Sequence, residues 1–379
     1  MTAATPPAVT PPAAGGERPW RVAVPWRSLI MVGALVSIWI VFSMTTDGTF
    51  LRSRNLSLLA RQTSVTAILA VGMVLVIVAG QIDLSVGALA GLMGGLAALA
   101  YMNRQWPLGL ALLAVLVGGA VLGAAQGSLV AWLKIPPFIV TLGGMLLFQG
   151  ALLGITGGVT LSPSLPFLYV GQAYVPKPLG WIIGALMAAA LLATGLRGGR
   201  ARALSRAGFA LLVLGFTAVM NAYQGIPVPV LLLLALAAFF SGVAHHTRFG
   251  RHLYAIGGNR EAAFYSGISI ERHIVGVFTV MGLLSAVAGI VLTARVGAAT
   301  SDAGRIMELD AIAAAVIGGT SLLGGQGTVW GALLGALVMA SLDNGMSLMN
   351  TEAFWQPIIK GSILVAAVAV DMAGRRTRG

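Results

Sequence analysis

Cysteine is absent from this chain of 379 residues, and charged residues make up only 9% of it. The lack of cysteine excludes disulfides, thiolate chemistry and cysteine-ligated zinc. A soluble domain carries about 25% charged residues, so the scarcity of charge, together with a mean hydropathy of +0.92, excludes an ordinary water-soluble protein. The hydrophobic residues, 58% of the total, gather in long apolar runs.

Long stretches of alternating polar and apolar residues are also missing, which excludes a porin-type barrel. Apolar runs of about 18 or more residues are typical of membrane-spanning helices. We therefore expect an all-α, polytopic integral membrane protein with about 10–12 transmembrane segments. The expected segments lie near residues 29–46, 56–79, 84–102, 108–133, 138–156, 179–196, 209–222, 229–246, 274–294, 311–323, 328–348 and 355–372.

The segment 311–323 is shorter than the others and ends in GGTSLLGGQG. Non-helical backbone is tolerated at membrane depth only where it is buried in protein or lines a cavity. We therefore expect a half-helix or a re-entrant element there rather than a full span.

The basic residues predict the orientation of the segments. With the N-terminus inside and twelve crossings, 15 of the 23 Lys and Arg residues fall on the cytoplasmic side and six on the other side. This bias agrees with the positive-inside rule, so both termini are expected in the cytoplasm. Residues 1–27, rich in Ala, Thr and Pro, are predicted to be a disordered tail, residues 28–373 the transmembrane domain and residues 374–379 a basic tail.

Two cytoplasmic loops differ in character. The loop 197–208 is basic and featureless, and we interpret it as a topology anchor. The loop 247–273 is longer and of mixed charge, with a turn GGN followed by REAAFYSGI. Its residues Glu261, Ala262 and Ala263 favour a helix, which Gly267 can end as a C-cap. We expect a short helix at the membrane surface.

Motifs for ATP binding and hydrolysis are missing from the chain. A Walker A loop needs a lysine followed by Ser or Thr, and none of the three lysines has that neighbour. The serine-hydrolase and metalloprotease motifs are absent too. No catalytic residue, metal site or cofactor is expected, and the scattered basic residues predict no nucleic-acid binding. The four histidines in or beside loop 247–273 are interpreted as loop residues and not metal ligands: His245, His246, His252 and His273.

Three carboxylates lie near the expected helix ends, namely Asp83, Asp310 and Asp343. Asp83 can accept hydrogen bonds from the free amides of a helix that starts at Leu84. The alternative is that it lines a translocation pathway. The same two interpretations apply to Asp310. Asp343 and its neighbour Asn344 are expected to face a polar cavity. The candidate pathway or cap residues are Gln81, Asp83, Ser85, Asp310, Asp343 and Asn344.

Three segments together resemble the permease subunits of bacterial monosaccharide ABC importers, the ribose/xylose/galactose group. They are GQIDLSVGALAGLMGG, YAIGGNREAAFYSGI and ELDAIAAAVIGGTSLLGGQGTVWGALLGALVMASLDNGMSLM. The resemblance covers roughly residues 40–373. The segments IPPFIVTLGGMLLFQGALLGIT and SLDNGMSLMNTEAFWQPIIKG, with the extra hairpin around loop 197–208, are most similar to the D-xylose type.

The resemblance implies a homodimer of permeases in the bacterial inner membrane, surrounded by lipids, that receives a monosaccharide from a periplasmic binding protein. It favours D-xylose, with arabinose, glucose, galactose or ribose as alternatives. It also implies a cytosolic ATP-binding subunit, which would hold ATP and Mg and dock on loop 247–273. The residues similar to the family's coupling motif and its approach are Gly257, Gly258, Asn259, Glu261, Ala262, Ala263 and Gly267.

Two other classes remain open from the residues alone. An ion-coupled secondary sugar carrier would move its substrate without an ATPase, and a membrane scaffold or receptor would transport nothing. Neither class explains the mixed-charge loop 247–273.

Overall fold

The computed structural model describes residues 26–196 and 199–376, which form helices joined by short connections. In chain order the helices are α1 (Trp26–Thr45), η1 (Thr49–Leu51), α2 (Ser53–Val78), α3 (Val86–Met102), α4 (Leu108–Ala131), α5 (Pro137–Thr156), α6 (Leu165–Gln172), α7 (Lys177–Leu196), α8 (Arg200–Asn221), α9 (Val228–His246), α10 (Arg248–Gly258), α11 (Arg260–Tyr265), α12 (Ile270–Val296), α13 (Met307–Ile317), α14 (Val329–Leu348) and α15 (Trp355–Arg376). Within these residues the only β-type pairings are two isolated bridges.

Each expected apolar segment contains a helix, so the polytopic all-α fold is confirmed. Eight of the described helices are long and apolar enough to cross a membrane: α2, α4, α5, α7, α8, α9, α12 and α14. Shorter apolar stretches lie in α1, α3 and α15.

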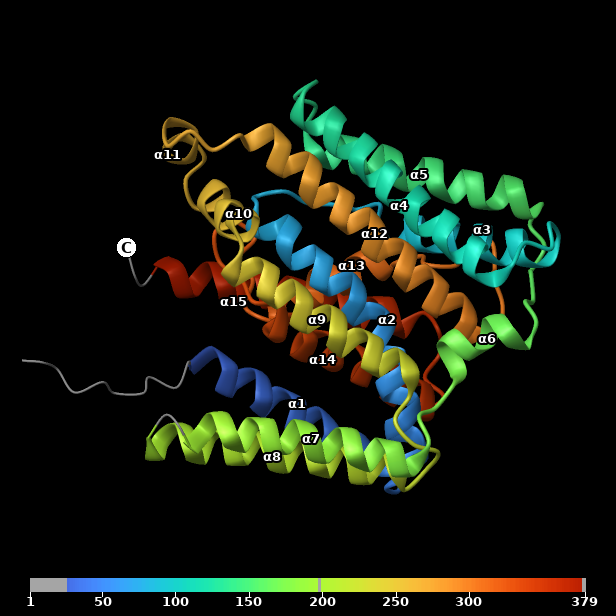
Figure 1. The fold of residues 1–379 in the computed structure, drawn as a ribbon, viewed down its shortest axis with the longest axis vertical. Helices are drawn as coiled ribbons and strands as arrows, with labels where there is room; N and C mark the ends of the chain where they lie inside the picture. The colour runs from blue at the N-terminus through green and yellow to red at the C-terminus, as the bar shows by residue number, and fades with distance from the viewer. Residues whose placement is uncertain (1–25, 197–198, 377–379) are drawn as a thin grey trace, which may run out of the picture.

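The helices run side by side in one bundle (Figure 1). One end carries α10 and α11 together with the first described turn of α1 and the last of α15, and we call it the loop end. The opposite end, beside α6, is the far end. The two described chain ends therefore share a side with the loop 247–273, as the topology predicted. The cytoplasmic orientation of that side stays a prediction.

The centre of the bundle is formed by α2, whose most apolar 18-residue window is 89% buried, against 22% for α4 at the periphery. α2 packs against α9, α12, α13 and α14. α4 packs closely on α12 through Gly119, Gly123 and Gly127. These small residues recur every four positions and let the two backbones approach, which is the usual basis of helix packing in membranes.

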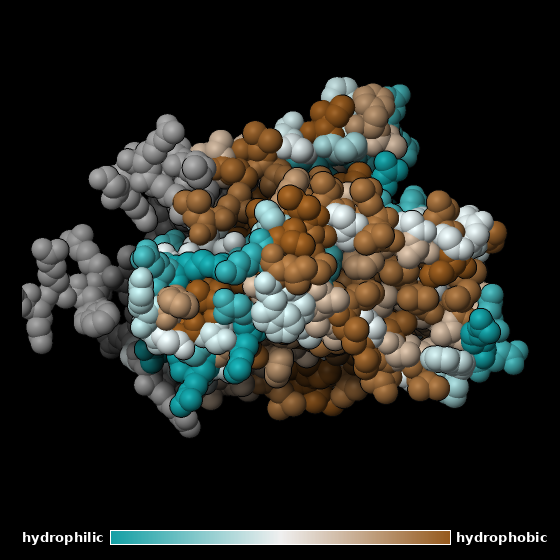
Figure 2. All heavy atoms as spheres, turned by 90° about the horizontal axis from the view of Figure 1, so that it is seen from above, coloured by the Kyte–Doolittle hydropathy of each residue, from teal (hydrophilic) through white to brown (hydrophobic). Residues whose placement is uncertain are grey.

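The outward faces of the bundle are apolar rather than polar. Leu113, Val117 and Val121 on α4, and Leu146 and Leu147 on α5, are all more than half exposed. Figure 2 shows hydrophobic side chains over the middle of the molecule and more hydrophilic groups toward both ends. Such a band matches the hydrocarbon core of a bilayer.

Two crossings of the bundle are only partly helical. α13 has 11 residues and rises about 16 Å, half of the roughly 30 Å hydrocarbon thickness. The non-helical stretch 297–306 leads into α13 from the far end, and after α13 the amide of Gly325 donates to the carbonyl of Val78 at the loop end, 2.9 Å away. The half-helix expectation is confirmed, and turns rather than helix flank α13 on both sides.

The second partly helical crossing is that of α3. Residues 79–85 return into the bundle without helical structure, and α3 begins at Val86. The expected start at Leu84 is wrong by two residues, because Asp83 and Ser85 form a turn of their own, described below.

Three further differences concern segment ends and short helices. Residues 200–208 belong to α8 rather than to a featureless loop, since Arg and Ala favour helix. α6 and α10 were not expected at all. The predicted tails lie outside the described residues, except that Trp26 and Arg27 begin α1 and residues 374–376 complete α15.

Candidate functional site

The loop 247–273 folds into two short helices, α10 and α11, where one was expected. The side chain of Thr247 accepts a hydrogen bond from the amide of Gly250, 3.2 Å away, and so caps α10. Asn259 ends α10 and starts α11, and its Oδ1 accepts from the amide of Ala262 at 2.9 Å. This N-cap bond satisfies one of the free amides of the first turn. The GGN turn of the sequence is thus the junction of two helices.

Gly267 lies just after α11 with a φ of +78°, in the left-handed region. Its amide donates to the carbonyl of Phe264 at 2.9 Å, and the amide of Ile268 donates to Ala263 at 3.1 Å. These two bonds define a Schellman motif, which glycine favours because it lacks a Cβ. The helix end expected at Gly267 is therefore present, one residue beyond the C-cap Ser266.

The outward face of α11 carries an acidic and an aromatic surface. Glu261 is exposed in the first turn, where a carboxylate complements the helix dipole. Phe264 and Tyr265 are 62% and 78% exposed. By contrast Ala263 is only 4% exposed and packs inward. The sequence prediction named Ala263 and missed both aromatics, although exposed aromatic residues on a polar loop are a signal of a binding surface.

α10 is attached to the core of the bundle at two points. Tyr254 Oη donates to the carbonyl of Gly327, 2.7 Å away, in the connection between α13 and α14. A Cβ on Gly257 would collide with the carbonyl oxygen of Val78 and the amide of Gly325. Gly257 is thus needed for close approach, whereas Gly258 has open space where a Cβ would stand. A displacement of α10 would act directly on the end of α2 and on the connection between α13 and α14.

The turn before α3 brings together Gln81, Asp83 and Ser85, which are 5%, 2% and 0% exposed. Asp83 Oδ1 accepts hydrogen bonds from the amide and the hydroxyl of Ser85, at 2.8 and 2.7 Å. The carboxylate therefore closes an Asx-turn that leads into α3, and its partner is Ser85 rather than a helical amide. Gln81 reaches only the carbonyl of Ala79, at 3.4 Å.

Gln126 on α4 extends this group and was not predicted. Its Oε1 lies 3.1 Å from the hydroxyl of Ser85, and its Nε2 is buried without a partner. Because a hydroxyl has one proton and Asp83 receives it, turning the amide by 180° gives the better arrangement. Gln126 Nε2 then donates to Ser85 and Ser85 donates to Asp83, in a chain that joins α4 to the start of α3.

Asp310 and Asp343 come together around a lysine that the prediction missed. Lys360 Nζ on α15 donates to Asp310 Oδ2 on α13 at 3.0 Å and lies 2.8 Å from Asp343 Oδ1 on α14. All three side chains are less than a fifth exposed. Ionisable groups in a membrane segment pair in this way because an isolated charge there is expensive. Asn344 points elsewhere and pairs with Asn55 on α2.

The two partly helical crossings meet at Gly87 and Gly304. A Cβ on Gly87 would collide with the carbonyl oxygen of Gly304 and with Glu308 Oε2, and a Cβ on Gly304 would collide with the carbonyl of Gly87. Glu308 is 7% exposed and its Oε2 has no hydrogen-bond partner. It lies at the first turn of α3, where the helix dipole favours a negative charge. Glu308 is not among the site residues predicted from the sequence.

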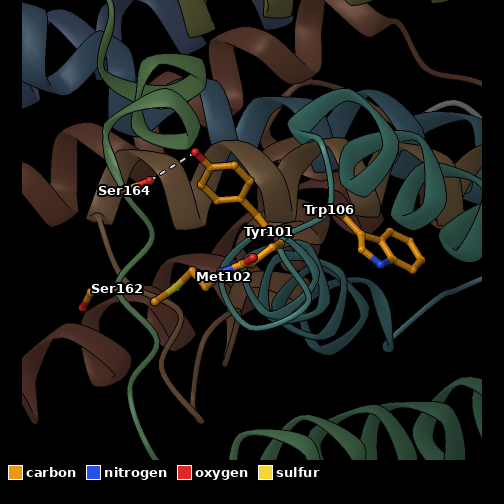
Figure 3. Close-up of a pocket in the computed structure, with 6 residues that line it drawn as sticks. Tyr101, Met102, Trp106, Ser162 and Ser164 are labelled. Atoms are coloured by element: carbon orange, nitrogen blue, oxygen red, sulfur yellow. Dashed lines mark hydrogen bonds between the residues drawn. The ribbon is translucent and has the colours of Figure 1, made fainter.

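A shallow cavity of about 430 Å³ opens at the far end, lined by Tyr101, Met102, Gln105, Trp106, Ser162 and Ser164. Ser164 Oγ donates to Tyr101 Oη at 3.1 Å, and the Trp106 ring points away from that pair (Figure 3). None of the predicted site residues lines this cavity. Among the described residues, no group of three or more His, Asp or Glu side chains is placed to hold a metal ion.

Comparison with known proteins decides the family. A family model described as a branched-chain amino acid transport system permease component matches residues 55–368. The chain belongs to this permease family. No solved structure matches it.

Among curated relatives, the permease is 50% identical over 361 residues to the xylose transport system permease protein XylH of Escherichia coli K12, with 92% of each chain covered. It is 46% identical to the XylH protein of Haemophilus influenzae, over 92% of this chain and 96% of the relative. The ribose import permease RbsC of E. coli K12 is 36% identical over 90% of this chain and 92% of the relative. The resemblance to sugar permeases is thus confirmed. The chain is a multi-pass protein of the inner membrane, and its role is in transport rather than enzymatic.

Proposed function

We propose that this chain is the transmembrane subunit of an ATP-driven importer for a monosaccharide, and that the sugar is D-xylose. The observation that carries the proposal is the identity of 46–50% along nearly the whole chain to permeases named for xylose. Relatives named for ribose and for D-allose stand at 36% and 33%. Another monosaccharide is the alternative that the first experiment tests.

The partner subunit that hydrolyses ATP would dock on α10 and α11. The exposed Glu261, Phe264 and Tyr265 supply a charged and aromatic contact surface, of the kind enriched in protein interfaces. α10 contacts the end of α2 and the connection between α13 and α14 through Gly257 and Tyr254. ATP and Mg belong to the partner in this proposal, and the permease itself holds no cofactor.

Two copies of the permease would form the translocation pathway between them, and a periplasmic binding protein would deliver the sugar to it. ATP binding would draw the partner subunits together and move both α10–α11 units. The bundles would then shift between outward-open and inward-open populations. Residues 81–84 and 298–305 lie between helices and take no part in an i→i−4 hydrogen-bond ladder, so the bundle would change shape at these segments.

The experiment that tests the proposal is reconstitution of the permease with its ATPase and binding protein in lipid vesicles. ATP hydrolysis and sugar uptake are measured with D-xylose, ribose, arabinose, glucose and galactose. We expect stimulation by the binding protein loaded with D-xylose and little with the others. Hydrolysis that ignores the loaded binding protein would overturn the importer assignment, whereas stimulation by another sugar would change the substrate alone.

Two variants test the proposed docking of the ATPase subunit on α11. Phe264→Ala and Tyr265→Ala are expected to reduce copurification of the ATPase subunit by about ten-fold or more, because exposed aromatic anchors dominate interface energies. Leu323→Ala removes an equally exposed apolar side chain (65%) near the loop end and serves as control. Equal copurification in all three variants would place the ATPase elsewhere.

An ion-coupled carrier is the second candidate, and the buried group of Lys360, Asp310 and Asp343 is the observation that favours it. Intramembrane carboxylates often form proton or ion relays. This candidate requires sugar uptake driven by a proton or sodium gradient in vesicles that contain the permease alone. Uptake only with ATP and the partner subunits would exclude it.

A further inference from the structure

A second cavity, of about 340 Å³, lies along the outer side of α1. Val36, Ile40 and Met44 in its lining are half exposed or more, so the cavity opens toward the surroundings of the bundle. Its α1 residues recur every three or four positions and therefore form one stripe, about 12 Å long, in the part of α1 nearer the far end. The full lining is Val36, Trp39, Ile40, Ser43, Met44 and Leu51. Apart from the one serine, the lining is hydrophobic.

The walls of this cavity are held in place by contacts behind them. Trp39 Nε1 donates to Ser341 Oγ on α14 at 3.0 Å, and the Trp39 ring meets the Phe50 ring edge-on, with centres 5.9 Å apart. The amide of Phe50 donates to Thr46 Oγ1 at 3.1 Å, which fixes η1 against the end of α1. Because Phe50 is fully buried, its neighbour Leu51 is held at the rim. The cavity is therefore a preformed feature of the fold.

Two exposed arginines follow the cavity in the chain, at its far-end rim. Arg52 comes directly after the lining residue Leu51, and Arg54 lies in the first turn of α2. That turn holds no acidic residue, and the helix dipole there favours an anion. Asp47, in the turn between α1 and η1, is exposed as well. Among the described residues, however, the only carboxylates within 4 Å of a basic side chain are those paired with Lys360.

A phospholipid presents its groups in the same order along the membrane normal as this surface does. The hydrophobic stripe of α1 lies at the depth of acyl chains, and the two cations lie where the bundle leaves the hydrocarbon. Arginine binds a phosphate through charge-assisted hydrogen bonds that are often bidentate. A second permease is a poor occupant, because a two-fold interface sets each patch against itself. Such an interface would bring the arginines of both copies together.

We propose that the cavity along α1 is a specific site for one anionic phospholipid, whose acyl chain fills the cavity and whose phosphate is held by Arg52 and Arg54. The bound lipid would join α1 to the start of α2, whereas the contacts of α1 within the protein are mainly with α14 and η1. The site depends neither on which sugar is carried nor on the ATPase subunit.

The test measures binding of phosphatidylglycerol to the delipidated permease in a non-ionic detergent, by native mass spectrometry over a range of lipid concentrations. One molecule per permease is expected to bind about ten-fold or more tightly than phosphatidylcholine, which has no net charge. Raising the salt concentration should reduce this preference, since the arginines are exposed to solvent.

Two variants separate the headgroup from the chain. Arg52→Gln/Arg54→Gln is expected to weaken phosphatidylglycerol binding by about ten-fold and to leave phosphatidylcholine binding unchanged. Ile40→Trp adds a bulky ring to the cavity from an exposed position. It is expected to weaken both lipids by about ten-fold, because several methylene groups lose their apolar contacts.

Each variant has a matched control. Arg104→Gln removes another exposed arginine, in the connection between α3 and α4, and Leu113→Trp adds the same ring on the exposed face of α4. Both should leave the phosphatidylglycerol affinity within about two-fold, since isolated exposed groups contribute little. Thermal unfolding in lipid-free detergent verifies that all four variants are folded.

Several results would overturn the site. Equal binding of the two lipids by the wild type would show that the arginines do not select an anion. Unchanged phosphatidylglycerol binding in Ile40→Trp would place the acyl chain elsewhere. A loss in the controls as large as that in the site variants would reduce the effect to general lipid coating. Ile40→Trp permeases that dissociate into single copies, with lipid affinity kept, would assign this face to the second copy instead.

Discussion

Asn55 on α2 and Asn344 on α14 exchange two side-chain hydrogen bonds, of 2.8 and 3.1 Å, although 289 residues separate them in the chain. Asn55 Nδ2 also donates to the carbonyl of Phe50 at 2.9 Å. The paired amides satisfy each other's donors and acceptors where water is scarce. Asn344 was predicted to face a polar cavity or pathway, and in the structure it joins the start of α2 to the last turns of α14, toward the far end of the bundle.

Asn344→Leu is expected to reduce the free energy of unfolding by about 1–2 kcal/mol, because it leaves the buried amide of Asn55 with one partner fewer. The double variant Asn55→Leu/Asn344→Leu should recover part of that loss. Unfolding midpoints in detergent check this. A double variant less stable than the sum of the single losses would contradict the reciprocal pairing.

Lys360→Met is expected to destabilise the permease by about 3 kcal/mol, since it removes the cation between two buried carboxylates and leaves both unpaired. Asp343→Asn should cost less, because Lys360 keeps its hydrogen bond to Asp310. Unfolding measurements on both variants, and on the triple variant Lys360→Met/Asp310→Asn/Asp343→Asn, give the comparison. The triple variant should be more stable than Lys360→Met alone.

Gly87→Ala is expected to cost about 2 kcal/mol or more, because the added methyl group meets the carbonyl of Gly304 and the carboxylate of Glu308. Gly143→Ala on α5 places the same methyl group in open space and should be neutral or slightly stabilising, since Ala favours helix. Thermal unfolding of the two variants, measured in parallel, decides whether the backbones at Gly87 and Gly304 are in such close contact.

A histidine pair joins α10 to α12. His273 Nδ1 lies 2.6 Å from the carbonyl of Ser269, which can only accept, so this nitrogen carries the proton. His273 Nε2 therefore accepts from His252 Nδ1 at 3.0 Å. Burial, the charge that His273 acquires on protonation, and the positive charges of Arg251 and Arg248 lower the pKa of His252 below its ordinary value of 6.5.

The pH dependence of stability follows from the lowered pKa of His252. Below pH 6.5 the unfolded chain binds more protons at this position than the folded chain, so the free energy of unfolding falls as the pH drops. We expect α10 to lose protection from hydrogen exchange as the pH falls through 6.5 and below it. His252→Asn can still donate to His273 and does not titrate, so it should show a shallower loss. Equal pH profiles would argue against the pair.

Asp83→Asn and Asp83→Leu separate the two interpretations of the carboxylate. If its role is to accept from Ser85 and hold the start of α3, Asn retains an oxygen acceptor and transport, whereas Leu costs about 1–2 kcal/mol and transport falls. A charge needed in the pathway would make both variants inactive although Asp83→Asn is stably folded. Uptake and unfolding measured on the same preparations distinguish these results.

Several features of the fold could be read from local patterns. Long apolar runs predicted the helices, and the short segment ending in GGTSLLGGQG predicted the half-helix α13. Gly267 predicted the end of α11, since a left-handed residue is needed there. The start of α3 was missed because Asp83 and Ser85 bond to each other and delay the helix. The loop 197–208 was misjudged because its arginines were assigned to topology and not to helix propensity.

The predicted site residues show that local patterns do not reveal which side chains meet in space. The sequence marked Asp310 and Asp343 as unusual but did not reveal Lys360, which is brought to them by the packing of α13, α14 and α15. Likewise Ala263 shares a helix with Phe264 and Tyr265, and only the way α11 rests on the bundle decides which of them is exposed.

The sequence by itself determined that this protein lies in a membrane as a bundle of helices and belongs among the sugar permeases, because hydrophobic length and short motifs are local properties of the chain. The tertiary structure decided which polar groups are partners: Asn55 with Asn344, and Lys360 with two aspartates. Buried polar groups must find partners, and those partners lie on helices far apart in the sequence, so only the packing of the bundle identifies them.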